Sequence, residues 1–138
     1  AVRAMDSAVV LARDFQKRIV DMATRFGWKH WHVPAPMRWA PTNKAYVPAA
    51  SAAGLADLIL THDDPPRLVF MELKGDGGKL SDAQREFLEA VQAVTDDLRK
   101  DVDGRGELRD DHAVVGVYAF WPKDEPVIEQ LLRSKVLT

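Results

Sequence analysis

Three charged side chains lie in or beside two aliphatic runs in the middle of the chain. Asp57 falls within residues 56–60, and Glu72 and Lys74 fall within residues 68–74. Both runs have the length and composition of strands, and the short polar, proline-containing stretch between them predicts a turn. An ionised group among buried aliphatic side chains is costly unless it is paired or binds a metal ion.

Strand periodicity indicates what these three side chains could do together. Because side chains alternate along a strand, Glu72 and Lys74 share one face. If the two runs pair as a hairpin, Asp57 reaches the same spot. Two carboxylates alone would repel, but a hard divalent cation such as Mg²⁺ accepts their oxygens together with retained waters. The lysine can then position or activate a water molecule that attacks a phosphate.

The order of these residues resembles the active-site signature of the PD-(D/E)xK nuclease superfamily. A strand-end glutamate and lysine alone are usually a surface salt bridge, so the prediction depends on the whole ordered pattern. That wider pattern is similar to the VRR-NUC family: Gly54-x-x-Asp57, Glu72-x-Lys74-Gly75 and Leu80-Ser81-x-x-Gln84.

The resemblance implies a role for each matching residue. Asp57 and Glu72 would be metal ligands, helped by the main-chain carbonyl of Leu73. Lys74 would be the catalytic lysine, and Gln84 a supporting residue at the site. The implied cofactor is Mg²⁺, with Mn²⁺ able to substitute.

The chain departs from the family pattern at two positions. Ala56 stands where the family usually has a proline before the aspartate, which leaves the carboxylate in place. Ala12 stands where the family often has a glutamate on the first helix, and the nearby Asp14 faces another way on a helix. The sequence leaves open whether another acid replaces that glutamate.

Composition limits the class of protein. The chain has 138 residues, 46% hydrophobic and 29% charged, which predicts one domain over residues 1–138. It has no cysteine, which excludes disulfides and thiolate zinc sites. No apolar run approaches the ~20 residues that span a bilayer. A cytoplasmic protein of a bacterium or a phage-infected host cell is expected, with no membrane partner.

The charge distribution favours a nucleic-acid partner, although the net charge of −2 alone argues against one. Residues 22–56 contain no acid but several basic and aromatic residues. Such a segment leading into an acidic metal site suits a phosphodiester backbone. The alternative is a core strand followed by a proline-rich loop. The candidate nucleic-acid contacts are His32, which could instead pack, Arg38, Lys44 and Lys79.

Hydrophobic periodicity predicts the elements that position these residues. The expected fold is α/β, a restriction-endonuclease-like mixed sheet of about four strands flanked by helices, in the order α-β-β-β-α-β-α. Residues 34–53 are expected to be irregular, and residues 101–112 a solvated loop. The expected helices span about 6–26, 82–100 and 125–134, and the expected strands span 28–33, 56–60, 68–74 and 113–121.

Two apolar faces are expected to pack on the sheet, and the strand at 113–121 is expected to be buried on both faces beside the strand that carries Glu72. The first face is Leu80, Ala83, Phe87, Val91, Val94 and Leu98. The second face, on the last helix, is Val127, Ile128, Leu131 and Leu132.

Together these features predict a metal-dependent DNA endonuclease. Small members of the resembled family include dimers that cut four-way DNA junctions, so branched DNA and a homodimer are expected. Two alternatives stay open: a catalytically weak nucleic-acid-binding module, and an interaction subunit of a larger phage or bacterial nuclease complex.

Overall fold

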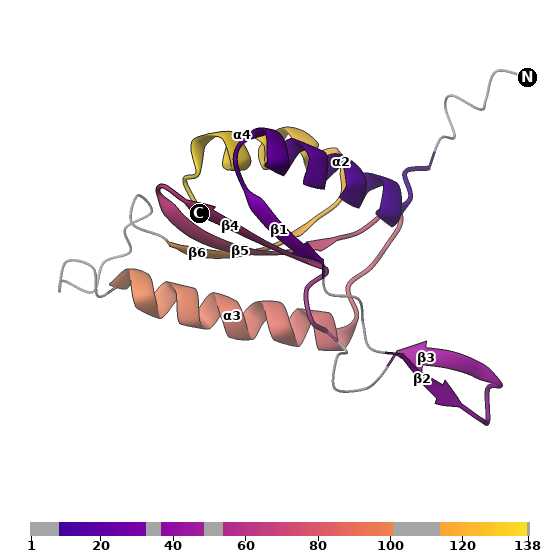
Figure 1. Cartoon of the computed structure of the whole chain (residues 1–138). Coiled ribbons are helices and arrows are strands. Elements are labelled where there is room, and N and C mark those ends of the chain that lie inside the picture. The colour runs from indigo at the N-terminus through magenta and orange to yellow at the C-terminus, as the bar shows by residue number, and fades with distance from the viewer. Residues whose placement is uncertain (1–8, 33–36, 49–53, 101–113, 138) are drawn as a thin grey trace, which may run out of the picture.

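The computed structural model describes residues 9–32, 37–48, 54–100 and 114–137. Figure 1 shows the helices and strands in chain order along the colour gradient. They are α2 (Ala12–Arg25), β1 (Lys29–His32), β2 (Met37–Ala40), β3 (Ala45–Pro48), β4 (Leu58–Asp63), β5 (Pro66–Leu73), α3 (Asp82–Lys100), β6 (Val115–Phe120), the 3₁₀ helix η3 (Pro122–Asp124) and α4 (Glu125–Ser134).

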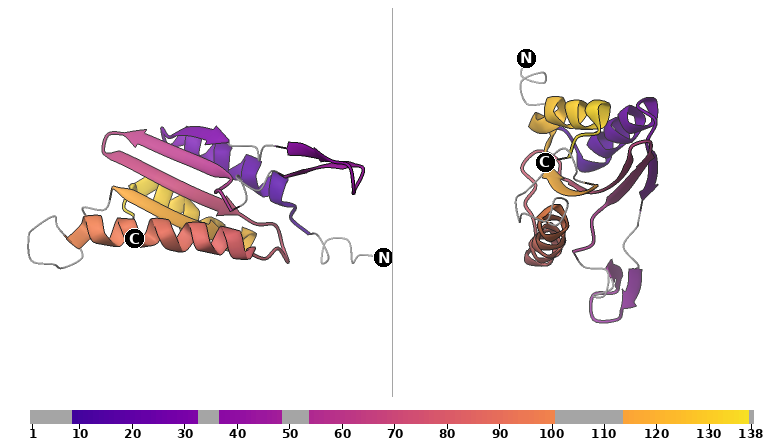
Figure 2. Two further views of the ribbon diagram at one scale, coloured as in Figure 1. Left: turned by 90° about the horizontal axis from the view of Figure 1, so that it is seen from below. Right: turned by 90° about the vertical axis from the view of Figure 1, so that its left-hand side faces the viewer.

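A four-stranded mixed sheet separates two helical layers. Its strand order is β1-β4-β5-β6, in which β1 pairs with β4 and β4 with β5 in antiparallel orientation, and β5 pairs with β6 in parallel. Helices α2 and α4 cover one face and α3 covers the other (Figures 1 and 2). The expected α/β class and four-stranded sheet are confirmed, and the arrangement is consistent with a restriction-endonuclease-like fold.

The main core lies between the sheet and the α2/α4 layer. Alternate residues of β4 and β5 point into it, which is the period-two pattern of a strand with one apolar face. Their fully buried partners come from α2 and α4. The largest members of this core are Phe15, Ile19, Leu58, Leu60, Met71, Leu73, Ile128 and Leu132.

Helix α2 begins at Ala12 and residues 9–11 are not helical, whereas the expected start at residues 6–7 lies outside the described residues. Two hydrogen bonds of 2.9 Å tie Val10 to Asp76: the Val10 N–H donates to Asp76 Oδ2, and the Asp76 backbone N–H donates to the Val10 carbonyl. The expected end of the helix is confirmed. Gly27 has a φ of +87° and donates its N–H to the Thr24 carbonyl, which closes the helix as a glycine C-terminal cap.

The expected irregular conformation of residues 34–53 is wrong where the structure describes the segment. Strands β2 and β3 form a separate antiparallel hairpin, away from the main sheet in Figure 1. The described prolines do not prevent it, because Pro41 lies in the turn and Pro48 is the last residue of β3. Trp39 and Tyr46 pair across the hairpin with ring centroids 5.2 Å apart.

Helix α3 has the expected bounds but a different rotation. Val94 and Leu98 are 58% and 51% exposed, whereas Thr95 and Arg99 are buried. Gln84 points to the sheet from the first turn, as described below. Thr95 and Arg99 lie about three and four turns further on, on the same side. The side of α3 that faces the sheet is therefore the side that carries Gln84, Thr95 and Arg99. The expectation that Val94 and Leu98 are buried is wrong.

Strand β6 is an edge strand of the sheet. It lies beside β5 as expected, but Val115, Tyr118 and Ala119 are only partly buried, so burial on both faces is wrong. Helix α4 packs Ile128, Leu131 and Leu132 inward and leaves Val127 59% exposed, contrary to expectation.

The hairpin of β4 and β5 is tighter than expected. Strand β4 ends at Asp63 and strand β5 begins at Pro66, which leaves Asp64 and Pro65 as the turn. The expected loop at 101–112 lies outside the described residues. Within the described residues, none of the helices has the length and apolar character needed to cross a membrane.

Candidate active site

The pairing of β4 with β5 places Asp57 beside Glu72. Leu58 is in register with Met71, so the next pair toward the start of β4 is Asp57 with Glu72. The backbone N–H of Asp57 donates to Glu72 Oε2 at 3.3 Å. Phe70, on the same face of β5 as Glu72, packs against Phe87 of α3 with ring centroids 5.8 Å apart. The carboxylates therefore meet on the α3 side of the sheet.

Glu72 is 2% exposed and has three polar contacts. Its Oε1 atom lies 3.3 Å from Lys74 Nζ and accepts a 2.7 Å hydrogen bond from Gln84 Nε2. The Asp57 backbone N–H donates to the other carboxylate oxygen, Oε2. The predicted neighbourhood of Asp57, Glu72, Lys74 and Gln84 is thus present in the structure.

The surroundings of the Glu72 carboxyl disfavour its charged form. Burial, and next the negative charge of Asp57, raise the pKa of Glu72 to about 7, although Lys74 acts in the opposite direction. A carboxyl with this pKa is partly protonated near neutral pH. A divalent cation bound by Glu72 would favour the ionised form of this carboxyl.

Gln84 has a fixed orientation because both ends of its amide are used. Its Oε1 accepts the backbone N–H of Ser81 at 2.9 Å, and its own backbone N–H donates to Ser81 Oγ at 3.1 Å. This reciprocal pair is a capping box at the start of α3. The Nε2 group must then face Glu72, which explains the Leu-Ser-x-x-Gln motif physically.

Replacing the Gln84 amide with a carboxylate tests this arrangement. Gln84→Glu keeps the acceptor of the capping box but places a second negative charge against buried Glu72. We expect it to lower the unfolding free energy of the metal-free protein at pH 8 by about 1–3 kcal/mol, measured by urea denaturation. Asn43→Asp makes the same amide-to-carboxylate change at an exposed position in the β2–β3 turn and should have little effect. Equal stabilities of the two variants would contradict the contact.

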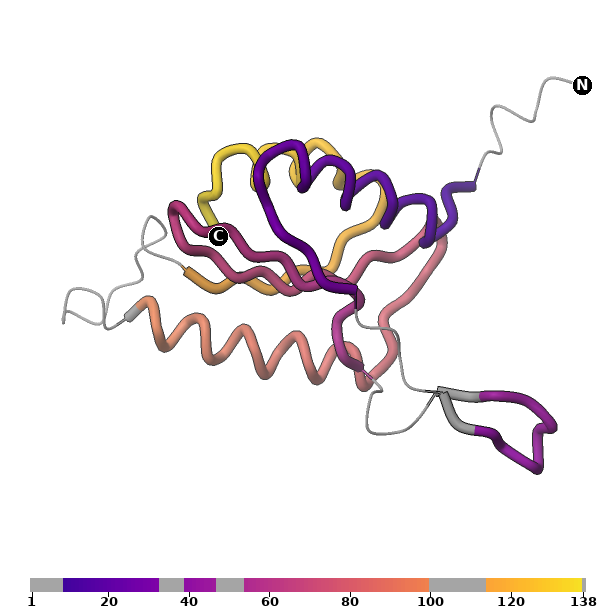
Figure 3. Tube along the Cα trace, viewed as in Figure 1, coloured from indigo at the N-terminus to yellow at the C-terminus, as the bar shows by residue number. Residues whose placement is uncertain are grey.

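Two glycines bring the helix starts to the carboxylates. Gly54 has a φ of +90°, and a Cβ there would lie 2.3 Å from the Ala83 carbonyl oxygen of α3. A Cβ on Gly75 would lie 2.7 Å from the Ala12 backbone nitrogen of α2. Figure 3 shows the chain after β5 passing the start of α2 before it reaches α3. Only glycine permits both of these close approaches, which explains why the motif has glycine at positions 54 and 75.

Ala12, the position of the family's glutamate, therefore begins α2 next to the site. Asp14 does not replace that acid there, because its side chain is 65% exposed and lies 4.0 Å from Arg13. The acid at the start of α2 is Asp76, whose Oδ2 accepts the Val10 N–H. Sequence reasoning missed Asp76. The only signal for it was an acid inside a run of glycines.

Among residues 9–32, 37–48, 54–100 and 114–137, no cluster of three or more His, Cys, Asp or Glu side chains could hold a metal ion. The donors at the site are the carboxylates of Asp57 and Glu72, with the Leu73 main chain next in sequence. Mg²⁺ is usually held by one or two carboxylates and keeps several waters. The residues present fit Mg²⁺ better than a metal that needs a full set of protein ligands.

The four predicted nucleic-acid contacts are not gathered in one place. His32 is in register with Leu58, on the α2 side of the sheet, and its Nδ1 lies 2.6 Å from Gln16 Nε2. Arg38 and Lys44 belong to the β2–β3 hairpin, where Lys44 is exposed. Lys79 is exposed in the segment before α3. Their binding roles stay predictions, and only Lys79 lies in the segment that leads from Lys74 to Gln84.

The candidate site thus combines a buried glutamate at the end of central strand β5, a lysine two residues further on and an aspartate directly before β4, on a sheet consistent with a restriction-endonuclease-like fold. Residues 43–96 match the family model described as the VRR-NUC domain. The matched segment contains Asp57, Glu72, Lys74 and Gln84. Over this segment the chain is similar to VRR-NUC nuclease domains, as the sequence motifs predicted. No curated protein matches the chain, and no solved structure does so either.

Proposed function

We propose that this protein is a Mg²⁺-dependent DNA endonuclease of the PD-(D/E)xK type, with Mn²⁺ able to replace Mg²⁺. The observation that carries the proposal is the buried Glu72 carboxylate, held by Lys74, Gln84 and the Asp57 backbone. A buried acid with a pKa raised by a second acid is a feature of sites that bind cations or transfer protons. A purely structural ion pair would not need Asp57 beside it.

Each residue of the site has a separate role in phosphodiester hydrolysis. Asp57, Glu72 and the carbonyl of Leu73 would hold the cation, which supplies positive charge for the attacking and leaving oxygens. Lys74, 17% exposed, is fixed by Glu72 and can still donate to a water or a phosphate oxygen. Water attacks phosphorus, the new P–O bond forms and the ester P–O bond breaks. Gln84 holds the Glu72 rotamer during this step.

Binding without cleavage is a second candidate function, favoured by one observation. Ala12 supplies no carboxylate at the start of α2, so the site has fewer acids than the family often has. A weak metal site would then leave a nucleic-acid-binding module. Calorimetric titration with Mn²⁺ separates the two candidates, because the nuclease proposal requires metal binding that Glu72→Ala abolishes.

We infer that the substrate is branched DNA. Supporting this, the acid-free segment 22–56 includes the β2–β3 hairpin, which carries Lys44, Trp39 and Tyr46 on its surface. Trp39 and Tyr46 are 50% and 66% exposed, and exposed rings beside a cation suit unpaired bases near a strand crossing. The test is cleavage of labelled four-way junction, flap, duplex and single-stranded DNA in Mg²⁺ and Mn²⁺. Faster cleavage of plain duplex than of junction or flap would contradict this inference.

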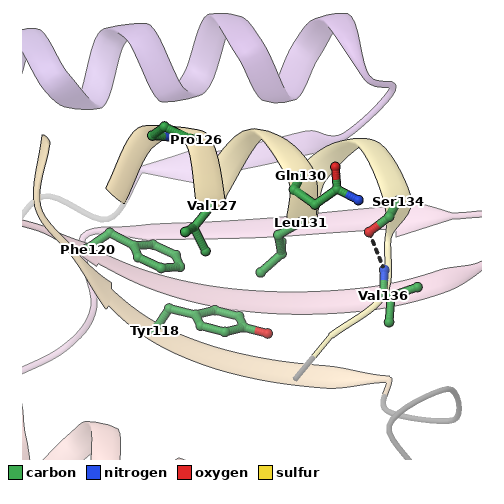
Figure 4. Close-up of a pocket in the computed structure, with 8 residues that line it drawn as sticks. All are labelled: Tyr118, Phe120, Pro126, Val127, Gln130, Leu131, Ser134 and Val136. Carbon is green, nitrogen blue, oxygen red and sulfur yellow. Dashed lines mark hydrogen bonds between the residues drawn. The ribbon is translucent and has the colours of Figure 1, made fainter. Parts of the chain in front are cut away.

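The same proposal includes a homodimer, because two sites related by a two-fold axis can nick paired strands. A hollow of about 740 Å³ lies between edge strand β6 and helix α4. Figure 4 shows Tyr118, Phe120, Val127 and Leu131 around it, and none of its eight labelled residues is charged at neutral pH. An apolar hollow beside a strand at the edge of the described sheet suits contact with a second copy.

Two matched valines test this dimer contact. Val127 lines the hollow and is 59% exposed, whereas Val94 on α3 is 58% exposed and lies elsewhere. We expect Val127→Glu to convert the dimer to a monomer in light-scattering chromatography, because a charge would be buried at the interface. Val94→Glu should leave the mass unchanged. A monomeric wild type at micromolar concentration would contradict the proposal, as would a dimeric Val127→Glu.

A further inference from the structure

A second, smaller hollow of about 340 Å³ opens beside the catalytic strand. It is lined by Asp76 and Gly77 from the turn after β5, and by Trp121 and Lys123 from the segment after β6. None of these four residues was assigned a role from the sequence. The hollow therefore combines an aromatic ring, a cation, an anion and a glycine backbone.

This hollow is structurally joined to Lys74. The Lys74 backbone N–H donates to the Phe120 carbonyl at 2.9 Å. Trp121 is therefore the residue directly after the hydrogen-bond partner of Lys74. Trp121 Nε1 donates to the Gly78 carbonyl at 2.8 Å. A Cβ on Gly78 would lie 3.3 Å from the Lys74 Cβ, so Gly78 itself lies against the lysine side chain. The hollow is therefore one short segment away from the catalytic lysine.

Both walls of the hollow are held by hydrogen bonds. On one side, Asp76 is tied to Val10 through its carboxylate and its backbone N–H. On the other side, the Trp121 backbone N–H donates to Asp124 Oδ2 at 2.8 Å. Between them, no atom lies within 4 Å of a Cβ placed on Gly77. The hollow is thus preformed and open, which lowers the conformational cost of filling it.

The lining chemistry selects the class of occupant. Lys123 is exposed and can donate to a phosphate oxygen, and the indole of Trp121 offers an apolar surface for a base or sugar. Asp76 is acidic, so a phosphate ion alone would be repelled. A nucleotide fits better, since the exocyclic amino group of a base can donate to that carboxylate. The mixture of charges matches the mixture of groups on one nucleotide.

We propose that this hollow binds the nucleotide next to the scissile phosphate of a DNA strand. Lys123 contacts the adjoining phosphate, Trp121 contacts the base and Asp76 accepts its amino group. The inference rests on the proposed nuclease function, because that function places a DNA strand across Lys74. It adds a site that positions the strand and favours an unpaired nucleotide over one stacked in a duplex.

Binding is measured separately from cleavage so that the two proposals can fail independently. Fluorescence anisotropy follows labelled single-stranded DNA and four-way junction in Ca²⁺ with full-length wild type, Lys123→Gln and Lys135→Gln. Lys135 is the control, because its carbonyl accepts from Arg67 at the opposite end of β5. We expect only Lys123→Gln to reduce the slope of log K against log salt, by about 0.7–0.9 for one lost phosphate contact.

A substitution on the DNA side makes the test specific. A methylphosphonate replaces each phosphate in turn around the mapped cut, and an abasic residue replaces each nucleotide. At one position the methylphosphonate should weaken binding to wild type but not to Lys123→Gln. An abasic residue at the neighbouring position should weaken wild-type binding about fivefold or more.

Each outcome decides one of the two proposals. A salt slope unchanged in Lys123→Gln overturns the nucleotide site, whatever the protein cleaves. The same holds if every abasic position binds within twofold of the intact strand. If wild type cleaves no DNA in Mg²⁺ or Mn²⁺ while Lys123→Gln still lowers the salt slope, the proposed nuclease function fails, and the hollow binds DNA but not beside a scissile phosphate.

Discussion

Glu72→Gln is expected to give a metal-free protein that is more stable than wild type but cannot cleave DNA. The substitution keeps the shape of the side chain and an acceptor for Gln84 Nε2. It removes a buried negative charge next to Asp57 and within 3.3 Å of Lys74. Because burial and Asp57 outweigh Lys74 in their effect on the pKa of Glu72, losing the charge should be favourable on balance.

The pH dependence gives this expectation a definite sign. The pKa of Glu72 is raised from 4.5 in the unfolded chain to about 7 in the folded protein. Between these values the folded state binds more protons, so wild-type stability falls as pH rises. The advantage of Glu72→Gln should be absent below pH 4.5, grow through this window and be complete above pH 7. We expect about 1–3 kcal/mol at pH 8.5.

Urea denaturation in EDTA at pH 4, 6 and 8.5 measures this difference. Glu129→Gln is a control, because it removes a carboxylate of similar type from an exposed pair with Arg133 on α4. In Mg²⁺, Glu72→Gln should cleave on the order of 100-fold or more slowly than wild type. A variant less stable than wild type at pH 8.5 without metal would refute this account of the Glu72 carboxyl.

Lys74→Met is expected to stop the chemical step while leaving the metal site present. The methionine keeps most of the aliphatic stem but has no ammonium group to donate to water or phosphate. Loss of a positioned proton donor or acceptor typically costs 10²- to 10⁴-fold in rate, and we expect a fall in this range for single-turnover cleavage. Mn²⁺ should still bind in calorimetry, because both carboxylates remain.

Lys79→Met tests whether the effect of Lys74→Met is specific to the catalytic position or follows from the loss of any positive charge. Lys79 is an exposed lysine five residues further along, and its expected role is phosphate contact. Its removal should raise the DNA concentration needed for half-maximal rate but leave the saturated rate within about threefold of wild type. If Lys79→Met and Lys74→Met lower the saturated rate equally, Lys74 has no special part in the reaction.

The parts of the site that follow from local rules were predictable from the sequence. Alternation along a strand placed Glu72 and Lys74 together, and a hairpin brought Asp57 to them. The motif Ser81-x-x-Gln84 is a capping box, and Gln84 also donates to the Glu72 carboxylate at the end of β5. In these cases local periodicity and tertiary structure agree.

The parts that depend on tertiary contacts were not predictable. The apolar residues of α3 indicated a buried face through Val94 and Leu98, but the bond from Gln84 to Glu72 sets the rotation of the helix. Prolines at 41 and 48 suggested a loop, yet they fall at the turn and the end of a hairpin. Trp121 and Asp76 come together only because two chain turns meet beside β5, and no sequence spacing encodes that meeting.

We propose that Asp57, Glu72 and Lys74 form one metal-dependent cleavage site. The most direct measurement is cleavage of a labelled four-way junction by EDTA-treated protein as Mn²⁺ is added, for wild type, Glu72→Ala and Lys74→Ala in parallel. The account predicts no cleavage without metal, saturable activation of wild type, and no cleavage by either variant at any metal concentration. Wild-type cleavage in EDTA, or variants as active as wild type, would contradict it.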